Sequence, residues 1–198
     1  STQGYSSAAS DVYKRQGGMY NIYNALAAFA VGRTFDVSPE QISQAFAYDE
    51  KVFGRQEVIQ LGAKKLTLIL VKNPVGLNQV LSMIQTAKQP FGFAMLLNAN
   101  YADGIDTSWI WDGNFEEFVA SKKAADYLVG GERYQDIALR LKVAGVPETK
   151  LTIKPDLGDV LTTLQEMPQQ QLYVLATYTA MLQLRKKLSD GGYIKGGF

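Results

Sequence analysis

Three nearly uninterrupted apolar runs constrain the fold of this chain more than any other feature of its sequence. They cover residues 65–71 (KLTLILV), 91–97 and 172–177. Apolar runs of this length are typical of strands that are buried on both faces of a sheet. A strand of that kind needs a layer of structure on each side, so the runs predict an α/β fold in which helices cover a mostly parallel sheet.

The segments between these runs carry helical patterns and turn signals. Further strands are predicted at 55–61, 127–129 and 151–153, and helices at 21–31, 76–88, 115–121, 133–143, 157–166 and 179–188. Another helix is expected to start after Ser38, because serine is a good N-cap, Pro39 suits the first helical position and Gln41 completes a capping box. Strands that alternate with helices predict a doubly wound, Rossmann-like sheet with helices on both faces.

The length of 198 residues fits one domain with a short appendage. We assign residues 19–190 to an α/β domain and the glycine-rich residues 191–198 to a flexible tail. Residues 1–18 are small, polar and without a periodic pattern, and we expect them to be non-native or disordered. Within them, residues 6–16 (SSAASDVYKRQ) resemble translated adapter sequence. We therefore expect the natural sequence to begin near Gly17 and Gly18, in the middle of a longer protein.

The composition excludes several kinds of site. The chain has no cysteine and no histidine, which removes most zinc sites and every Ser-His-Asp or Cys-His triad carried by one chain. A net charge of +1 implies no strong electrostatic attraction to nucleic acid or to a membrane, and no apolar run has transmembrane length. Neither a GxGxxG nor a GxxxxGKS/T phosphate loop is present. We therefore expect no metal site here, and any triad chemistry must use groups from another chain or domain.

In a doubly wound sheet, ligands bind beyond the carboxyl ends of the strands. This rule selects three loops, at 72–77, 98–112 and 130–133. The third loop, Gly130-Gly131-Glu132-Arg133, opens a helix and could hold an anion at the helix N-terminus. The alternative is a tight turn between strand and helix, which explains both glycines without a ligand.

The loop 98–112 is the richest in polar chemistry, with three aspartates, two asparagines and both tryptophans of the chain. Asp103-Gly104 is a turn signal, so Asp103 belongs either to an Asx-turn or to a functional site. Asp106 has two interpretations as well. It caps the backbone at Ser108 and Trp109, or it is a carboxylate at the ligand edge that orients the imidazole of a partner.

Two further pairs of residues have alternative interpretations. Trp109 and Trp111 would point to opposite faces of an extended segment, one toward the core and one outward. Asn21 and Asn24 lie on one helical face as polar residues within an apolar helix. They are either buried asparagines that cap a neighbouring loop or a pair that faces an adenine ring.

Several segments resemble the Mur ligase family. The stretch YNIYNALAA at 20–28 is similar to the segment that joins the ATPase domain of these ligases to their C-terminal domain, and Gly54-Arg55 stands at their glycine-arginine turn. Lys72-Asn73-Pro74 resembles a degenerate DYAHNP motif that lacks the acidic first residue. The most specific match is ADGIDTSWIWD at 102–112, which resembles the MurT subunits of this family. The likeness covers residues 19 to 188, nearly the whole chain outside the first segment.

The resemblance implies a Mur ligase C-terminal fold and a part in peptidoglycan synthesis. MurT subunits act with GatD, a class-I-like glutaminase that releases ammonia from glutamine. MurT activates the α-carboxylate of D-glutamate in lipid II with ATP, and ammonia converts it to D-isoglutamine. By its position in the motif, Asp106 would complete in trans the triad whose cysteine and histidine come from GatD. This work would take place in the bacterial cytoplasm, at the inner face of the membrane.

The resemblance also implies contacts with a nucleotide. Asn21 and Asn24 would contact the adenine, Arg55 the phosphates or ribose, and Lys72 and Asn73 the ribose. The central domain that normally supplies the phosphate loop and the Mg²⁺ ligands is not in the sequence, so most ATP and Mg²⁺ contacts would lie outside this chain. We therefore expect the isolated chain to be inactive. Two alternatives stay open: a module that only docks the glutaminase, or the C-terminal domain of another Mur or folylpolyglutamate-type ligase.

Overall fold

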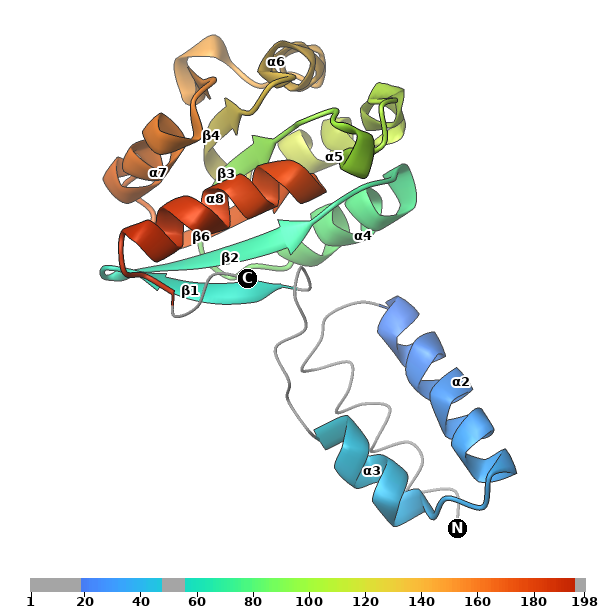
Figure 1. The fold of residues 1–198 in the computed structure, drawn as a ribbon. Helices are drawn as coiled ribbons and strands as arrows, with labels where there is room; N and C mark the ends of the chain where they lie inside the picture. Colours follow the sequence, from blue (N-terminus) through green and yellow to red (C-terminus); the bar gives the residue numbers. More distant parts are fainter. Residues whose placement is uncertain (1–18, 48–55, 195–198) are drawn as a thin grey trace. The chain divides into compact units, whose positions relative to one another are not determined.

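The computed structural model describes residues 19–47 and 56–194 (Figure 1). The chain divides into two compact units, residues 1–52 and 53–198. The first unit contains helices α2 (Met19–Thr34) and α3 (Pro39–Ala47). The capping box predicted for α3 is present, because Ser38 N–H donates to Gln41 Oε1 over 3.0 Å and Gln41 N–H donates to Ser38 Oγ over 3.2 Å.

The second unit is built on a six-stranded sheet in the order β1-β2-β6-β3-β4-β5. The strands are β1 (Glu57–Leu61), β2 (Lys64–Leu70), β3 (Phe91–Leu96), β4 (Ala124–Gly130), β5 (Leu151–Lys154) and β6 (Gln171–Ala176). A two-residue turn with Gly62 at a φ of +62° joins β1 to β2, so these two strands are antiparallel. All other neighbours are parallel, which confirms the predicted sheet.

Helices cover both faces of this sheet, as predicted (Figure 1). One face carries α4 (Pro74–Gln85), α5 (Phe115–Ala120) and α6 (Tyr134–Val143), and the other carries α7 (Leu157–Glu166) and α8 (Tyr178–Asp190). Three short 3₁₀ segments complete the unit: η1 (Tyr101–Asp103), η2 (Ser108–Asp112) and η3 (Glu148–Lys150).

Alternate residues of the central strands belong to two separate apolar cores. On β3, Phe93 and Met95 pack with α4, α5 and α6, whereas Ala94 and Leu96 pack with α7 and α8. All six residues of this strand are buried. A strand with a core on each face has no solvent side, which explains why its sequence shows no polar alternation.

The end of the described chain packs back onto the unit. Tyr193 and Ile194, which the sequence analysis places in the tail, lie against the core beneath α7 and α8, and Gln165 donates to Tyr193 Oη over 2.6 Å. Residues 195–198 lie outside the described part of the chain. Within residues 19–47 and 56–194, no helix combines the length and the apolar character needed to cross a membrane.

Candidate functional site

Strands β3 and β6 are neighbours whose connections leave toward opposite faces of the sheet. The chain after β3 leads to α5 on one face, and the chain after β6 leads directly to α8 on the other. Parallel neighbours with diverging connections define the place where doubly wound sheets bind ligands. Here the same place holds side chains of the protein itself, which bond to one another: Asn98, Asp103, Thr177 and Thr179.

Asn98, which follows β3 and is 1% exposed, connects three segments of the chain. Its backbone N–H donates to Thr177 Oγ1 over 2.9 Å, and its Nδ2 donates to Thr179 Oγ1 over 3.0 Å. Its Oδ1 accepts from the N–H of Glu132 over 2.9 Å. A buried amide that is satisfied in this way fixes the end of β3 to the turn after β4 and to the start of α8.

The glycine turn at 130–133 is a tight turn between strand and helix, as the ligand-free alternative predicts. Gly131 has a φ of +91°, and a Cβ atom there would lie 2.6 Å from Leu97 O. The backbone N–H groups that could face an anion donate within the protein instead. For Gly131, Glu132, Arg133 and Tyr134 the acceptors are Pro155 O, Asn98 Oδ1, Leu97 O and Gly131 O, respectively.

Asp103 is a buried carboxylate that binds the N-terminus of α8. Its Oδ1 accepts from Thr179 N–H over 2.7 Å, and its Oδ2 accepts from Thr179 Oγ1 over 2.6 Å. Thr177, the N-cap residue of α8, makes no side-chain cap of its own, and its hydroxyl bonds to Asn98. Asp103 therefore caps α8 from 76 residues away, with its negative charge at the positive end of the helix.

Asp103 also has the local turn role expected from the sequence. Its Oδ2 accepts from Asn100 N–H over 3.0 Å, and the two residues form a capping box on η1. The bond to α8 is the part that local sequence does not indicate. Asp103 is thus an anchor for the first half of the loop after β3.

Arg140, on α6, anchors the other end of that loop. Its side chain is 3% exposed, and it donates to Ile110 O over 3.2 Å and to Gly113 O over 2.7 Å. Both carboxylate oxygens of Glu116 accept from the same guanidinium, at 2.7 and 2.8 Å. The pKa of Glu116 is lowered below its usual value, mainly by this hydrogen bonding to Arg140.

Arg140 is not among the residues predicted from the sequence. A signal was present, because Arg140 lies three residues after Ile137 and next to Leu141, on the side of α6 that is buried. A charged residue at such a position must find partners in the core. Which partners it finds could not be read from the helix alone.

Asp106 lies in the exposed stretch between the two anchors. Its Oδ1 accepts from Ser108 N–H over 2.7 Å, and its Oδ2 accepts from Ser108 Oγ over 2.9 Å. The backbone bond first, and the hydroxyl bond second, lower the pKa of Asp106 below its usual value. The local cap expected at Ser108 is therefore present. It leaves an ionised carboxylate that is oriented and open to solvent.

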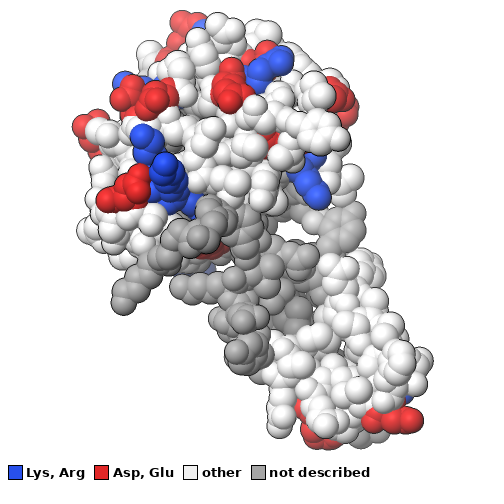
Figure 2. All heavy atoms as spheres, viewed as in Figure 1, with Lys and Arg blue, Asp and Glu red and all other residues white. Residues whose placement is uncertain are grey.

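Apolar side chains are exposed on both sides of Asp106 in the sequence. Tyr101 is 92% exposed, Ile105 72% and Trp111 47%. Trp109 packs against the core, so the expected division between an inner and an outer tryptophan is confirmed, although the segment is a 3₁₀ helix and not extended. The guanidinium of Arg140 lies 5.4 Å from the centre of the Trp111 ring. On the face seen in Figure 2, acidic and basic side chains are intermixed.

The residues predicted to contact a nucleotide lie in two different units. Asn21 and Asn24 are in α2, where Asn24 is exposed and so is not the buried cap of the alternative interpretation. The side chain of Asn21 and the whole of Arg55 lie outside the described part of the chain. Lys72 and Asn73 follow β2; Lys72 is exposed, and Asn73 is the N-cap of α4, with its Oδ1 accepting from Gly76 N–H over 2.8 Å.

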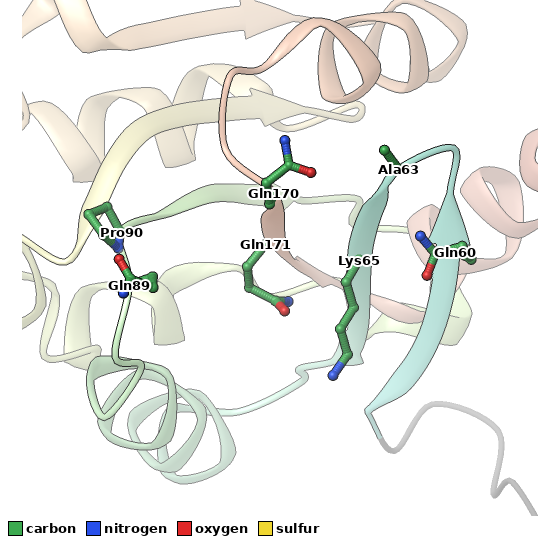
Figure 3. Close-up of a pocket in the computed structure, with 7 residues that line it drawn as sticks. All are labelled: Gln60, Ala63, Lys65, Gln89, Pro90, Gln170 and Gln171. Atoms are coloured by element: carbon green, nitrogen blue, oxygen red, sulfur yellow. The ribbon is translucent and has the colours of Figure 1, made fainter.

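Two hollows lie at opposite edges of the sheet. One, of about 380 Å³, is at the carboxyl ends of β4 and β5, and its lining does not include Asp106. The other, of about 520 Å³, is at the amino ends of β2, β3 and β6 (Figure 3), and is lined by Gln60, Ala63, Lys65, Gln89, Pro90, Gln170 and Gln171. Among the described residues, no group of three or more histidine, cysteine or acidic side chains is placed to hold a metal ion.

Known proteins resemble this chain in sequence. Residues 70–181 match the family described as MurT ligase C-terminal. The MurT subunit of the glutamine-hydrolysing lipid II isoglutaminyl synthase of Streptococcus pneumoniae is 49% identical over 174 residues, which are 88% of this chain and 39% of that protein. The MurT subunit of Staphylococcus aureus is 31% identical over 179 residues, 88% of this chain and 40% of that protein. The chain thus spans about two fifths of the length of these relatives.

Solved structures share its fold. A MurF of Acinetobacter baumannii superposes with a TM-score of 0.63 at 18% identity, covering 87% of this chain and 38% of that one. Folylpolyglutamate synthase of Mycobacterium tuberculosis, complexed with ADP and AMPPCP, gives 0.58 at 16%, covering 91% and 41%. Identities this low show the fold alone, and they do not assign the chain to either kind of ligase. The match over residues 70–181 and the 49% identity to the pneumococcal subunit do assign it: the chain belongs to the MurT ligase C-terminal family.

Proposed function

We propose that this chain is the C-terminal domain of the MurT subunit of a lipid II isoglutaminyl synthase, and that it donates Asp106 to the triad of a GatD-like glutaminase. In the whole enzyme, the glutaminase releases ammonia from glutamine. The MurT subunit activates the α-carboxylate of D-glutamate in lipid II, at the inner face of the membrane, and ammonia converts it to the amide. The relatives named above carry the assignment of the enzyme.

One observation carries the assignment of Asp106. It is an exposed, ionised carboxylate whose two oxygens are already oriented by Ser108. A chain with no histidine and no cysteine cannot use such a group in a triad of its own. It can lend the group to an imidazole of another chain, where the carboxylate fixes the tautomer and stabilises the imidazolium.

Asp103 and Asp112, the other aspartates of the loop, fit this role less well. Asp103 is buried and both of its oxygens are bonded to Thr179. Asp112 is exposed, but none of the described residues orients its carboxylate through a hydrogen bond of the kind that Ser108 makes. Of the three aspartates in this loop, only Asp106 combines exposure with an orientation fixed by hydrogen bonds.

We also propose that this chain contacts ATP, which would activate the α-carboxylate of D-glutamate. The exposed amide of Asn24 can donate to and accept from an adenine ring, with Asn21 beside it in α2. Lys72 offers an exposed ammonium for the ribose. Asn73 would offer its amide nitrogen to the ribose as well, because its Oδ1 already caps α4. Arg55 would add a fixed positive charge. Phosphate and Mg²⁺ contacts would fall mainly to the central domain.

The test of Asp106 is the change Asp106→Asn in the full-length subunit paired with its glutaminase. We expect glutamine turnover to fall by orders of magnitude, because loss of the triad carboxylate in serine proteases costs about 10⁴ in kcat. Steady-state glutaminase kinetics measure the turnover, and size-exclusion chromatography measures the complex, which should survive. Asp112→Asn is the matched control and should leave both unchanged. Full glutamine hydrolysis by the Asp106→Asn enzyme would remove Asp106 from the triad.

A second candidate function is a docking module that contributes no triad member. The exposed side chains of Tyr101 and Ile105 favour it, because aromatic and apolar anchors dominate protein interfaces. The same experiment separates the two functions. Dissociation of the complex by Asp106→Asn would favour docking, whereas a stable but inactive complex would favour the triad.

A further inference from the structure

We propose that Ser108 is a positioning residue for glutamine hydrolysis, which sets the orientation of the Asp106 carboxylate before the glutaminase binds. This inference rests on the proposed role of Asp106 in the triad. It concerns a residue of this chain that would touch neither glutamine nor the imidazole.

The geometry of Ser108 fits this role. One residue supplies two donors to two different oxygens, its N–H to Oδ1 over 2.7 Å and its Oγ–H to Oδ2 over 2.9 Å. Two bonds to the two ends of a carboxylate fix both side-chain torsions of Asp106, which a single bond would not do. A carboxylate has about four lone-pair positions, so positions for an imidazole N–H remain after both bonds are made.

Asp106 needs such a device because it is exposed. A free aspartate at the surface samples several rotamers, and an interface must then fix one of them at an entropic cost. Misplacement of a reacting group by about 1 Å can reduce the rate about 10²-fold. Ser108 is itself held at the start of η2, which Arg140 ties to α6, so the orientation is transmitted from the core.

The electrostatic surroundings of Asp106 point to the same residue. The backbone and then the hydroxyl bond from Ser108 lower the pKa of Asp106, and desolvation acts in the opposite direction. Among the described residues, no charged side chain on a neighbouring element contributes to this lowering. Asp103 is turned toward α8, and the guanidinium of Arg140 is bonded to Glu116 and to two carbonyl groups.

The experiment compares Ser108→Ala, Ser108→Thr and Asp106→Asn in the full-length subunit bound to its glutaminase. Ser108→Ala keeps the backbone donor and removes the hydroxyl. We expect kcat for glutamine hydrolysis to fall about tenfold, as for the loss of one hydrogen bond to a charged group. The KM for glutamine and the affinity of the complex should not change. Ser108→Thr retains a hydroxyl at an exposed position and should restore kcat.

A direct readout is the pKa of Asp106, followed by the titration of its ¹³C-labelled carboxyl carbon by NMR. Since the hydroxyl bond favours the ionised form, Ser108→Ala should raise this pKa and Ser108→Thr should return it. Ser121→Ala is the matched control, because it removes a serine hydroxyl that donates locally to Phe118 O, over 2.6 Å, at the end of α5. It should leave kcat and the pKa of Asp106 unchanged.

The outcomes separate this inference from the proposed function. Wild-type kcat in Ser108→Ala, together with an inactive Asp106→Asn enzyme, would overturn the role of Ser108 alone. Full activity of Asp106→Asn would overturn the triad assignment and the inference with it. A loss in Ser108→Ala that reflects weaker complex formation, and that threonine does not rescue, would show a merely structural role and would also overturn the inference.

Discussion

Two stretches of the loop after β3 place aspartates three residues apart in opposite settings. The anchored stretch, 98–103, is held by Asn98 and Asp103, whose partners are on α8 and in the turn after β4. The presented stretch, 104–108, contacts the solvent, and the partner of its aspartate is two residues away. A buried carboxylate needs several hydrogen-bond donors within the protein, whereas an exposed carboxylate can accept hydrogen bonds from another molecule.

The contrast shows how a loop can be rigid and still offer a reactive group. Arg140 fixes the far end of the loop, and Asp103 fixes the near end, so the presented stretch is short and has both ends tied to helices. Asp106 lies between the anchors, in the stretch that is open to a partner. A group presented from a rigid frame is pre-oriented, which lowers the cost of binding.

The largest loss of stability is expected from Arg140→Ala, which removes the far anchor. The carbonyl oxygens of Ile110 and Gly113 lose the guanidinium and keep only a backbone donor, the N–H of Gly113 and of Phe115, respectively. We expect a loss of about 3–6 kcal/mol in the free energy of unfolding, at about 1.5–3 kcal/mol for each lost hydrogen bond to a charged group. Glu116 is 60% exposed and will be solvated. Urea denaturation of this chain, followed by circular dichroism, measures the change.

Arg133→Ala is the matched control on the same helix, because its ion pair with Asp136 is exposed. It should cost less than about 1 kcal/mol, as exposed ion pairs do. Equal losses for the two arginines would mean that Arg140 is not an anchor.

A smaller loss is expected from Asp103→Asn, which alters the near anchor. The amide nitrogen must then face a donor of Thr179 or Asn100, so at least one buried bond is lost, at about 1–3 kcal/mol. Both tryptophans of the chain lie in this loop, so their fluorescence reports the opening of the loop. In Asp103→Asn, the fluorescence transition should occur at a lower urea concentration than the unfolding of the sheet, which circular dichroism measures. Asp106→Asn should leave the urea concentrations of both transitions unchanged. If Asp106→Asn shifted them as much as Asp103→Asn does, Asp103 would be no more of an anchor than Asp106.

A smaller loss than that of Asp103→Asn is expected from Asn73→Ala. Asn73 caps α4 from within its own sequence, three residues from its partner Gly76, whereas Asp103 caps α8 from 76 residues away. A local cap is worth about 1 kcal/mol. Thermal unfolding should therefore place Asn73→Ala between the wild type and Asp103→Asn. The reverse order would show that the distant cap adds no stability beyond a local one.

Most elements of the fold could be predicted because their signals are local. The capping box at Ser38 and Gln41 and the apolar run that became β3 depend on neighbouring residues, and both were found as predicted. The ends of the elements were less certain; the helix predicted at 76–88 runs from Pro74 to Gln85, because Asn73 rather than a later residue is the N-cap. No capping residue or apolar run in the sequence indicates the division into two compact units at residue 52.

The candidate site shows the same division between local and distant information. The bond from Ser108 to Asp106 spans two residues, and the sequence allowed for it as a cap. The bond from Asp103 to Thr179 and the bonds from Arg140 to the loop join segments that are far apart in the chain. No local pattern indicates them, because a buried charge can be satisfied by any segment that the fold brings near.

By itself, the sequence determined the alternation of strands and helices and the loops that lie at the carboxyl edge of the sheet. It also determined that any triad chemistry must use groups from another chain or domain. These follow from periodicity, capping residues and the absence of histidine and cysteine. Only the tertiary structure decided which aspartate is buried and which is presented. That choice depends on where α8 begins and on which side of α6 faces the loop, and both are set by the packing of helices on the two faces of the sheet.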